Sequence, residues 1–199
     1  MQKLMNVPAV YRSVQDALAA PLIRDVRAHF HAAHITADTH LHILDVGCGP
    51  GHSSSWFSGQ YTGVDLSPEY INHAKASFPG KNFIIGDASN FDLTEKNFDV
   101  AVSVGLYHHL PDAAVLQSLS TVLRHLKPDG QFHVVDAILP NHFWDNPAGY
   151  VLRKLDRGRF VRTPSAYRAM VESSGLTIVN YCEGRGGLLD YVYFVVRQN

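Results

Sequence analysis

Short apolar runs alternate with helical segments through the middle of the chain. Five of these runs are continuously apolar instead of alternating with polar residues. Continuous runs are typical of strands buried on both faces, and their alternation with helices predicts a parallel sheet in an α/β protein. The five predicted strands lie at 42–46, 61–65, 82–85, 99–104 and 131–136.

The pattern differs before and after this region. Apolar residues recur four apart between residues 9 and 34, which predicts helix, and Pro21 is expected to divide it into two short helices. Residues 137–162 are aromatic, basic and irregular. Thr163 and Pro164 then provide a cap and a first position for one more helix.

Two strand-like runs, 176–182 and 191–196, end the chain. The segment between them, 183–187, is rich in glycine, and a join of that length can make a hairpin. We therefore expect the final strand to be antiparallel and to lie at or near an edge of the sheet.

Composition limits the classes of protein to consider. The chain has 199 residues, 46% hydrophobic and 18% charged, which is typical of a folded core, and one domain over 1–199 is the default. The net charge of −1 gives no global field for DNA or an anionic membrane, so we expect neither as a partner. Two cysteines form no disulfide framework, and no leader or membrane span is apparent, so a cytoplasmic location is expected.

A glycine-rich turn, DVGCGPG at 45–51, follows the first predicted strand and enters a helix. Glycines let the backbone approach a ligand, and the free N–H groups of a helix N-terminus favour an anionic group. Asp65 ends the second strand, 18 residues beyond Gly47, an offset at which a carboxylate can accept both hydroxyls of a ribose. Together these features predict a nucleoside-bearing cofactor at the carboxyl ends of the strands.

The spacing of the glycines helps to distinguish between cofactors. The dinucleotide fingerprint has glycines at its first, third and sixth positions. Here the sixth position from Gly47 is His52, and Gly51 stands at the fifth. A bulky His52 is expected to obstruct the close packing of a pyrophosphate site, so the turn favours a smaller anion such as an amino-acid carboxylate. An NAD-linked oxidoreductase and a catalytically silent cofactor-binding protein remain alternatives.

Five motifs in order resemble the class I S-adenosylmethionine-dependent methyltransferases, in their small-molecule branch. They are DVGCGPG (45–51), VDLS (64–67), GDA (86–88), FDVAVSVGLYHHLPD (98–112) and LKPDGQFHVVD (126–136). The resemblance implies a Rossmann-like, doubly wound, seven-stranded and mostly parallel sheet with an antiparallel C-terminal strand. It implies S-adenosyl-L-methionine as cofactor, S-adenosyl-L-homocysteine as product, and a small-molecule acceptor. The expected parts are capping helices (1–38), a cofactor-binding core (41–136), a substrate-side insertion (137–162), and a helix with a C-terminal hairpin (163–199).

The resemblance also implies which residues contact the cofactor. Asp65 matches the acid that binds the ribose, and Leu66 lies beside the adenine. Asp45 and Asp87 have a structural alternative, because carboxylates at such positions often cap turns, and Cys48 has no neighbouring base and suits packing. The full implied set is Asp45, Gly47, Cys48, Gly49, Gly51, Asp65, Leu66, Asp87, Ala88 and Gly105.

Methyl transfer from a sulfonium is an in-line displacement, so the enzyme mainly aligns the acceptor and, where needed, removes its proton. His108 and His109 are the candidate bases, because histidine titrates near neutrality. We expect no metal, because the clustered histidines at 29, 31, 34, 40 and 42 lack acidic or cysteine partners at ligand spacing. The residues expected to contact the acceptor are Tyr11, Tyr107, Trp144 and Arg159.

Overall fold

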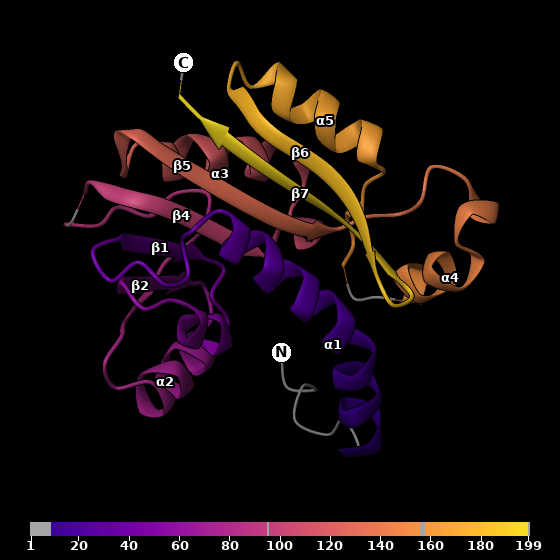
Figure 1. The fold of residues 1–199 in the computed structure, drawn as a ribbon, viewed down its shortest axis with the longest axis horizontal. Helices are drawn as coiled ribbons and strands as arrows, with labels where there is room; N and C mark the ends of the chain where they lie inside the picture. The colour runs from indigo at the N-terminus through magenta and orange to yellow at the C-terminus, as the bar shows by residue number, and fades with distance from the viewer. Residues whose placement is uncertain (1–8, 95, 156–157, 199) are drawn as a thin grey trace.

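The structure is a computed structural model that describes residues 9–94, 96–155 and 158–198, with side chains from residue 19 onward. Seven strands form one sheet in the order β3-β2-β1-β4-β5-β7-β6, and β7 alone runs against the others (Figure 1). This confirms the predicted fold class. The strands are β1 (His42–Val46), β2 (Gln60–Asp65), β3 (Asn82–Ile85), β4 (Phe98–Val104), β5 (Leu126–Ala137), β6 (Thr177–Gly186) and β7 (Leu189–Arg197).

The helices cover both faces of this sheet. Helices α1 (Ala9–Ala32) and α2 (Pro68–Ser77) pack on one face, and α3 (Asp112–Leu123) and α5 (Pro164–Ser173) pack on the other (Figure 1). The predicted caps of α2 and α5 are present, since the side chains of Ser67 and Thr163 each accept a backbone hydrogen bond at 3.3 Å. The remaining elements are short: η1 (His52–Trp56), η2 (Tyr107–His109), η3 (Phe143–Asp145) and α4 (Pro147–Leu155).

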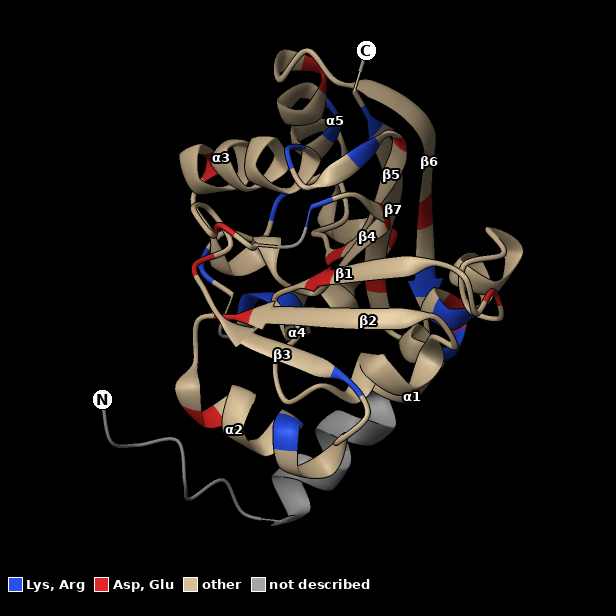
Figure 2. Ribbon diagram, turned by 90° about the vertical axis from the view of Figure 1, so that its left-hand side faces the viewer, with Lys and Arg blue, Asp and Glu red and all other residues tan. Residues whose placement is uncertain are grey.

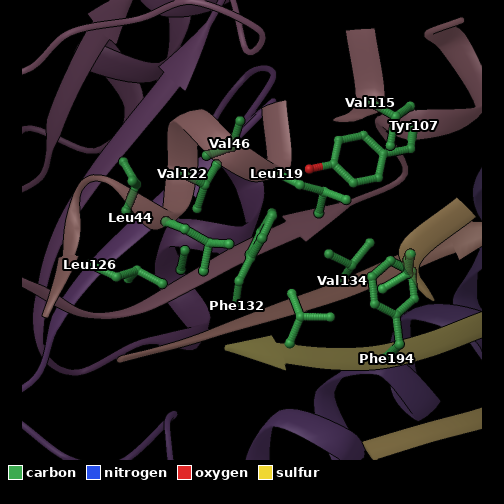
Figure 3. Packing of buried hydrophobic residues seen from close by; sticks show 14 of the residues in the cluster. Leu44, Val46, Tyr107, Val115, Leu119, Val122, Leu126, Phe132, Val134 and Phe194 are labelled. Atoms are coloured by element: carbon green, nitrogen blue, oxygen red, sulfur yellow. The ribbon is translucent and has the colours of Figure 1, made fainter. Parts of the chain in front are cut away.

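Large aromatic and aliphatic side chains fill the layer under α3 and α5. Phe132 and Phe194 rise from β5 and β7 to meet Leu119 of α3 and Tyr107 of η2 (Figure 3). All four are fully buried. This packing fixes the segment that follows β4, and that segment carries the two candidate bases.

The expected break of the first helix at Pro21 is wrong, because α1 is continuous from Ala9 to Ala32 with Pro21 inside it. A proline in a helix interior costs about 3 kcal/mol. Here Leu22 packs closely against Gly186, where any side chain would collide with it, and Val26 and Phe30 are buried against the sheet. These tertiary contacts offset the cost.

The C-terminal hairpin has a shorter turn than expected. Most of the glycine-rich segment 183–187 belongs to β6, which ends at Gly186, and β7 begins at Leu189. β7 inserts between β5 and β6, so β6 forms the edge of the sheet. The turn of the hairpin therefore lies at the same edge of the sheet as the carboxyl ends of the parallel strands.

Candidate functional site

The glycine-rich turn after β1 adopts a backbone that only glycine accommodates easily. Gly47, Gly49 and Gly51 all have positive φ, at 76°, 53° and 85°. A Cβ on Gly51 would lie 2.9 Å from the Cβ of Ala74, so α2 packs directly onto the turn there, whereas a Cβ on Gly49 would meet nothing within 4 Å. The turn is thus closed against the protein at Gly51 and open to a ligand at Gly49.

The side chain of His52 lies outside the packed part of the turn. Its side chain is exposed and lies beside the rings of His73 and Phe78, with centroids 6.5 Å away in both cases. The close contact of helix and strand is made by Gly51, one residue earlier. The close packing thus falls at the fifth position, and the expectation that His52 disfavours a pyrophosphate stays a prediction.

Asp45 supports the turn from inside the protein. Its Oδ2 accepts hydrogen bonds from Ser53 Oγ at 2.5 Å and from the Tyr61 hydroxyl at 2.6 Å. Burial raises the pKa of this carboxyl to about 6, and the two hydrogen bonds oppose that shift. Asp45 holds the first turn of η1 in place, which is the structural role left open by the sequence.

Asp65 ends β2, where Figure 2 shows an acidic segment at the carboxyl end of the strand. Its Oδ2 accepts from Gly49 N and its Oδ1 from Ser67 N, both at 2.9 Å. Each oxygen keeps one further acceptor site, as two vicinal hydroxyls require. The neighbouring apolar side chains are open to solvent, Leu66 by 68% and Ile85 by 53%. An anchored carboxylate between an open glycine and an exposed apolar rim fits a nucleoside.

The other predicted cofactor residues are placed less decisively. Asp87 is exposed and accepts from the Ser89 backbone N and Oγ at 2.8 and 2.7 Å, bonds that hold its pKa below the usual range. Ala88 is half-buried against the core. The Cys48 side chain is buried against Gly63, and burial raises the pKa of its thiol, so it packs as the sequence suggested.

The structure brings His108 to the end of β4. Gly105, with φ of 71°, follows that strand, and the first atom that a Cβ there would meet is His108 Cε1 at 3.7 Å. Asp136 at the end of β5 binds the same histidine twice: its Oδ1 lies 2.5 Å from Nδ1, and its Oδ2 accepts from the His108 backbone N at 3.0 Å. No described residue forms a hydrogen bond with Nε2. His109 is exposed, with its ring centroid 4.0 Å from that of His108.

Asp136 was not singled out from the sequence. Its side chain is 1% exposed, and it is the acidic residue that ends the fifth apolar run, just as Asp65 ends the second. Polar residues at the carboxyl ends of parallel strands gather at one edge of the sheet. The position of Asp136 at the end of an apolar run could therefore have identified it as a candidate site residue.

The return arm of the insertion covers His108. Phe160 N donates to the His108 carbonyl at 2.9 Å, and Gly158 packs on the imidazole ring so closely that any side chain there would collide with it. Arg162 then fixes η2, because its guanidinium donates to the carbonyls of Tyr107 and Leu110 at 2.9 and 2.7 Å. These contacts make the insertion the outer wall of the His108 site.

The four predicted acceptor contacts have different outcomes. The expected contact of Tyr107 with the acceptor is wrong. Tyr107 is fully buried in the core and its hydroxyl lies 3.1 Å from Ser118 Oγ, so its side chain presents no surface to an acceptor. Arg159 is exposed and lies between two residues that contact His108. Trp144 is 83% exposed on η3, with no described contact to His108 or to the glycine-rich turn. The side chain of Tyr11 lies outside the described part of the structure.

The described residues include neither a membrane-spanning helix nor a cluster of metal ligands. Within residues 9–94, 96–155 and 158–198, no helix has the length and hydropathy needed to cross a bilayer. In the same part of the chain, no three His, Cys, Asp or Glu side chains are grouped as metal ligands. Blue and red segments are interspersed over the ribbon in Figure 2.

Residues 43–130 match the family model described as a methyltransferase domain. Among curated proteins, the chain is 34% identical over 116 residues to a fatty-acid O-methyltransferase of Mycolicibacterium smegmatis, over 54% of this chain and 42% of that protein. It is 34% identical over 126 residues to a 2-methyl-6-phytyl-1,4-hydroquinone methyltransferase of Synechocystis, over 57% and 38% respectively. The matched parts thus span less than half the length of these relatives.

Solved structures show the same fold. A TehB-like SAM-dependent methyltransferase of Corynebacterium glutamicum superposes with a TM-score of 0.64 at 22% identity, over 94% of this chain and 100% of that one. SAM-dependent methyltransferases of Methanosarcina mazei superpose with a TM-score of 0.65 at 20% identity, over 84% and 97%. At these identities the superpositions support the fold alone.

Proposed function

We propose that the chain is a class I S-adenosylmethionine-dependent methyltransferase that transfers a methyl group from S-adenosylmethionine to a small lipophilic acceptor. The observation that carries the cofactor assignment is Asp65, whose carboxylate is anchored between the open turn at Gly49 and the exposed side chain of Leu66. We treat residues 1–199 as one methyltransferase domain, because all seven strands share one sheet. A cytoplasmic location stays a prediction from the sequence.

Different residues around the glycine-rich turn would bind different parts of the cofactor. Asp65 accepts the ribose hydroxyls, and Leu66 and Asp87 flank the adenine. Gly49 and Gly105 leave room for the methionine portion, Gly47 packs against Leu106, and Asp45 holds the turn from behind. When bound, S-adenosylmethionine supplies an electrophilic methyl group with a neutral leaving group. The task of this chain is then to align the acceptor and to exclude water, an advantage of roughly 7–11 kcal/mol in well-oriented reactions.

We assign the base to His108 in preference to His109. Asp136 binds Nδ1 and fixes the orientation of the ring, which leaves Nε2 to take a proton from an acceptor hydroxyl, amine or acidic carbon. The ring stands beside Gly105, at the end of β4. His109 is exposed, and its ring lies tilted at 42° beside that of His108, with the centroids 4.0 Å apart.

The acceptor class follows from two observations. The relatives reported above are named for a fatty acid and for a phytyl-bearing hydroquinone. In this chain, the insertion beside the site exposes Phe143, Trp144, Val151, Leu155 and Phe160 by 38–83%. An apolar acceptor suits such a surface. The family match also removes the support for the NAD-linked alternative.

Binding of S-adenosylhomocysteine, measured by titration calorimetry, tests the cofactor site. Asp65→Ala is expected to weaken binding by more than about 1 kcal/mol, because charged hydrogen bonds to the ribose are lost. Asp129→Ala, an exposed carboxylate near the start of β5, is the matched control and should bind as the unmodified protein does. Unchanged affinity of the Asp65 variant would refute the assignment. Methyl transfer to a fatty acid or hydroquinone then separates an active enzyme from a silent cofactor-binding protein.

A further inference from the structure

Helix α4 presents its polar side to the protein and its apolar side to the outside. Gly149 and Arg153, four residues apart, are buried, and Arg153 Nη2 donates to the carbonyl of Asp190 at 3.1 Å. On the opposite side Val151 is 49% exposed and Leu155 75% exposed, with Pro147 exposed beside them. Helices on globular proteins normally bury the apolar side. We call Pro147, Val151 and Leu155 the outer face of α4.

The orientation of α4 is fixed by specific polar contacts. Asn146, just before the helix, donates from Nδ2 to Asp190 Oδ2 at 2.7 Å and to the Leu188 carbonyl at 3.0 Å. Arg185 donates from Nε to Asp190 Oδ1 at 2.6 Å, so both oxygens of this buried carboxylate are engaged. Gly149 packs on the same hairpin turn, where a side chain would collide with the Leu188 carbonyl. The outer face is therefore held away from the protein.

The surroundings of the outer face combine aromatic and basic groups. Trp144 is 83% exposed and stands edge-to-face against Phe143, with centroids 5.0 Å apart. Lys154 and Arg159 are exposed nearby in the sequence, and the carboxylate of Asp145 is occupied by the His142 backbone N at 3.0 Å. Of the basic residues described in the insertion 137–162, Arg153 and Arg162 are buried and bound within the protein, so Lys154 and Arg159 are the exposed cations.

We propose that the outer face of α4, with Trp144, rests on the surface of a lipid bilayer that contains anionic lipid. Exposed tryptophan and aliphatic side chains with flanking basic residues are the chemistry that the interface of a membrane accepts. The exposed Lys154 and Arg159, and not the net charge of the chain, are the groups that would meet anionic lipid, which revises the expectation that no membrane is involved.

This contact places the active site next to the lipid. Three features lie at the carboxyl edge of the sheet (Figure 1). They are the hairpin turn that holds α4, the end of β5, and the residues proposed to bind the cofactor after β1 and β2. Because the return arm of the same insertion covers His108, an acceptor that leaves the bilayer enters beside the base. This step rests on the proposed function, since it is useful only where the acceptor is lipophilic.

Sedimentation of the full chain with vesicles tests the proposal, using phosphatidylcholine with and without phosphatidylserine. We expect binding that is stronger with phosphatidylserine, and Leu155→Gln is expected to lower it on the order of tenfold. Val179→Gln, which changes an equally apolar residue that is 46% exposed on β6, is the matched control and should bind as the unmodified chain does. In a Trp56→Phe background Trp144 is the one tryptophan left, and its emission should shift to the blue with vesicles.

Several outcomes would overturn the proposal: no sedimentation with either vesicle, equal losses for Leu155→Gln and Val179→Gln, or unchanged emission of Trp144. A dimer without lipid that Leu155→Gln dissociates would assign the outer face to a second copy of the chain instead. Circular dichroism and titration with S-adenosylhomocysteine are run on every variant. Intact binding of that ligand without vesicle binding refutes only the lipid contact, whereas loss of both in the unmodified chain refutes the methyltransferase assignment.

Discussion

Arg162 is the residue whose loss should loosen both the insertion and the segment that carries His108. Its side chain is 7% exposed and makes five hydrogen bonds, three to backbone carbonyls and two to Asp112 Oδ1 at 2.8 and 2.6 Å. In Arg162→Met the carbonyls of Leu110 and Phe160 lose this donor, and the carbonyl of Tyr107 keeps only the backbone N of Leu110. A buried acceptor without a partner costs about 1–3 kcal/mol, and some water will enter, so we expect a loss of about 3–4 kcal/mol in the free energy of unfolding.

The ion pair itself should contribute little of this. The side chain of Asp112 is 75% exposed, and exposed ion pairs contribute about 0–1 kcal/mol. Asp112→Asn is therefore the control that keeps the carbonyl contacts and removes the charge. Arg162→Lys keeps the charge but cannot span carbonyls that lie in different directions, so it should fall between the other two variants.

Urea unfolding at neutral pH, followed by circular dichroism, gives the free energies directly. The reasoning is refuted if Arg162→Met lies within about 1 kcal/mol of the unmodified protein, or if Asp112→Asn costs as much. A second readout concerns function. Because Arg162 contacts η2 and not Asp65, the variant should lose turnover while its affinity for S-adenosylhomocysteine stays unchanged.

The other predictions concern two buried titratable groups and one glycine. Burial lowers the pKa of His133 to about 4 from an ordinary 6.5, so its protonation favours the unfolded chain, and up to about 3 kcal/mol of stability should be lost as the pH falls from 6.5 to 4. His133→Phe should flatten that fall in urea unfolding at several pH values, and an unchanged slope would contradict the assignment. Asp45, with its pKa raised to about 6, has the opposite sign: its share of the stability is lost as the pH rises from about 4 to 6, so Asp45→Asn should steepen the acid-side fall. Gly51→Ala should destabilise by about 2–4 kcal/mol in the same assay, because φ is 85° and the new Cβ meets Ala74 at 2.9 Å; Gly80→Ala, in open space, is the control, and equal effects would sink the argument.

The sheet was predictable because the burial of each strand determines which of its residues are apolar. Strands covered on both faces must be apolar along their whole length, and all five such runs became β1 to β5. The continuity of α1 was not predictable in this way. Pro21 argues locally for a break, and what overrides it is a contact with Gly186, 165 residues away.

In the candidate site, too, features that depend on local spacing were predictable, and features that depend on distant contacts were not. Asp65 and the glycine-rich turn could be found because their function depends on spacing along the chain. Tyr107 was misassigned because an aromatic residue next to candidate bases does not reveal which way its ring points, and here it points into the core. Asp136 and Arg162 act through partners 28 and about 50 residues away, so only the folded chain shows the pair with His108 and the clamp on η2.

Helix α4 shows why the insertion was the hardest part to read. Its sequence, PAGYVLRKL, is amphipathic, and amphipathic spacing normally indicates that the apolar side faces the core. The orientation is instead decided by Asp190, a buried carboxylate that takes hydrogen bonds from Asn146 and Arg185 and whose carbonyl accepts from Arg153. In this orientation Asn146 donates to Asp190 Oδ2 and to the Leu188 carbonyl, and Arg153 donates to the Asp190 carbonyl. Because buried acceptors without a donor cost more than an exposed leucine, the apolar side turns outward. The polarity of the hairpin thus selects which side of the insertion is free to meet lipid.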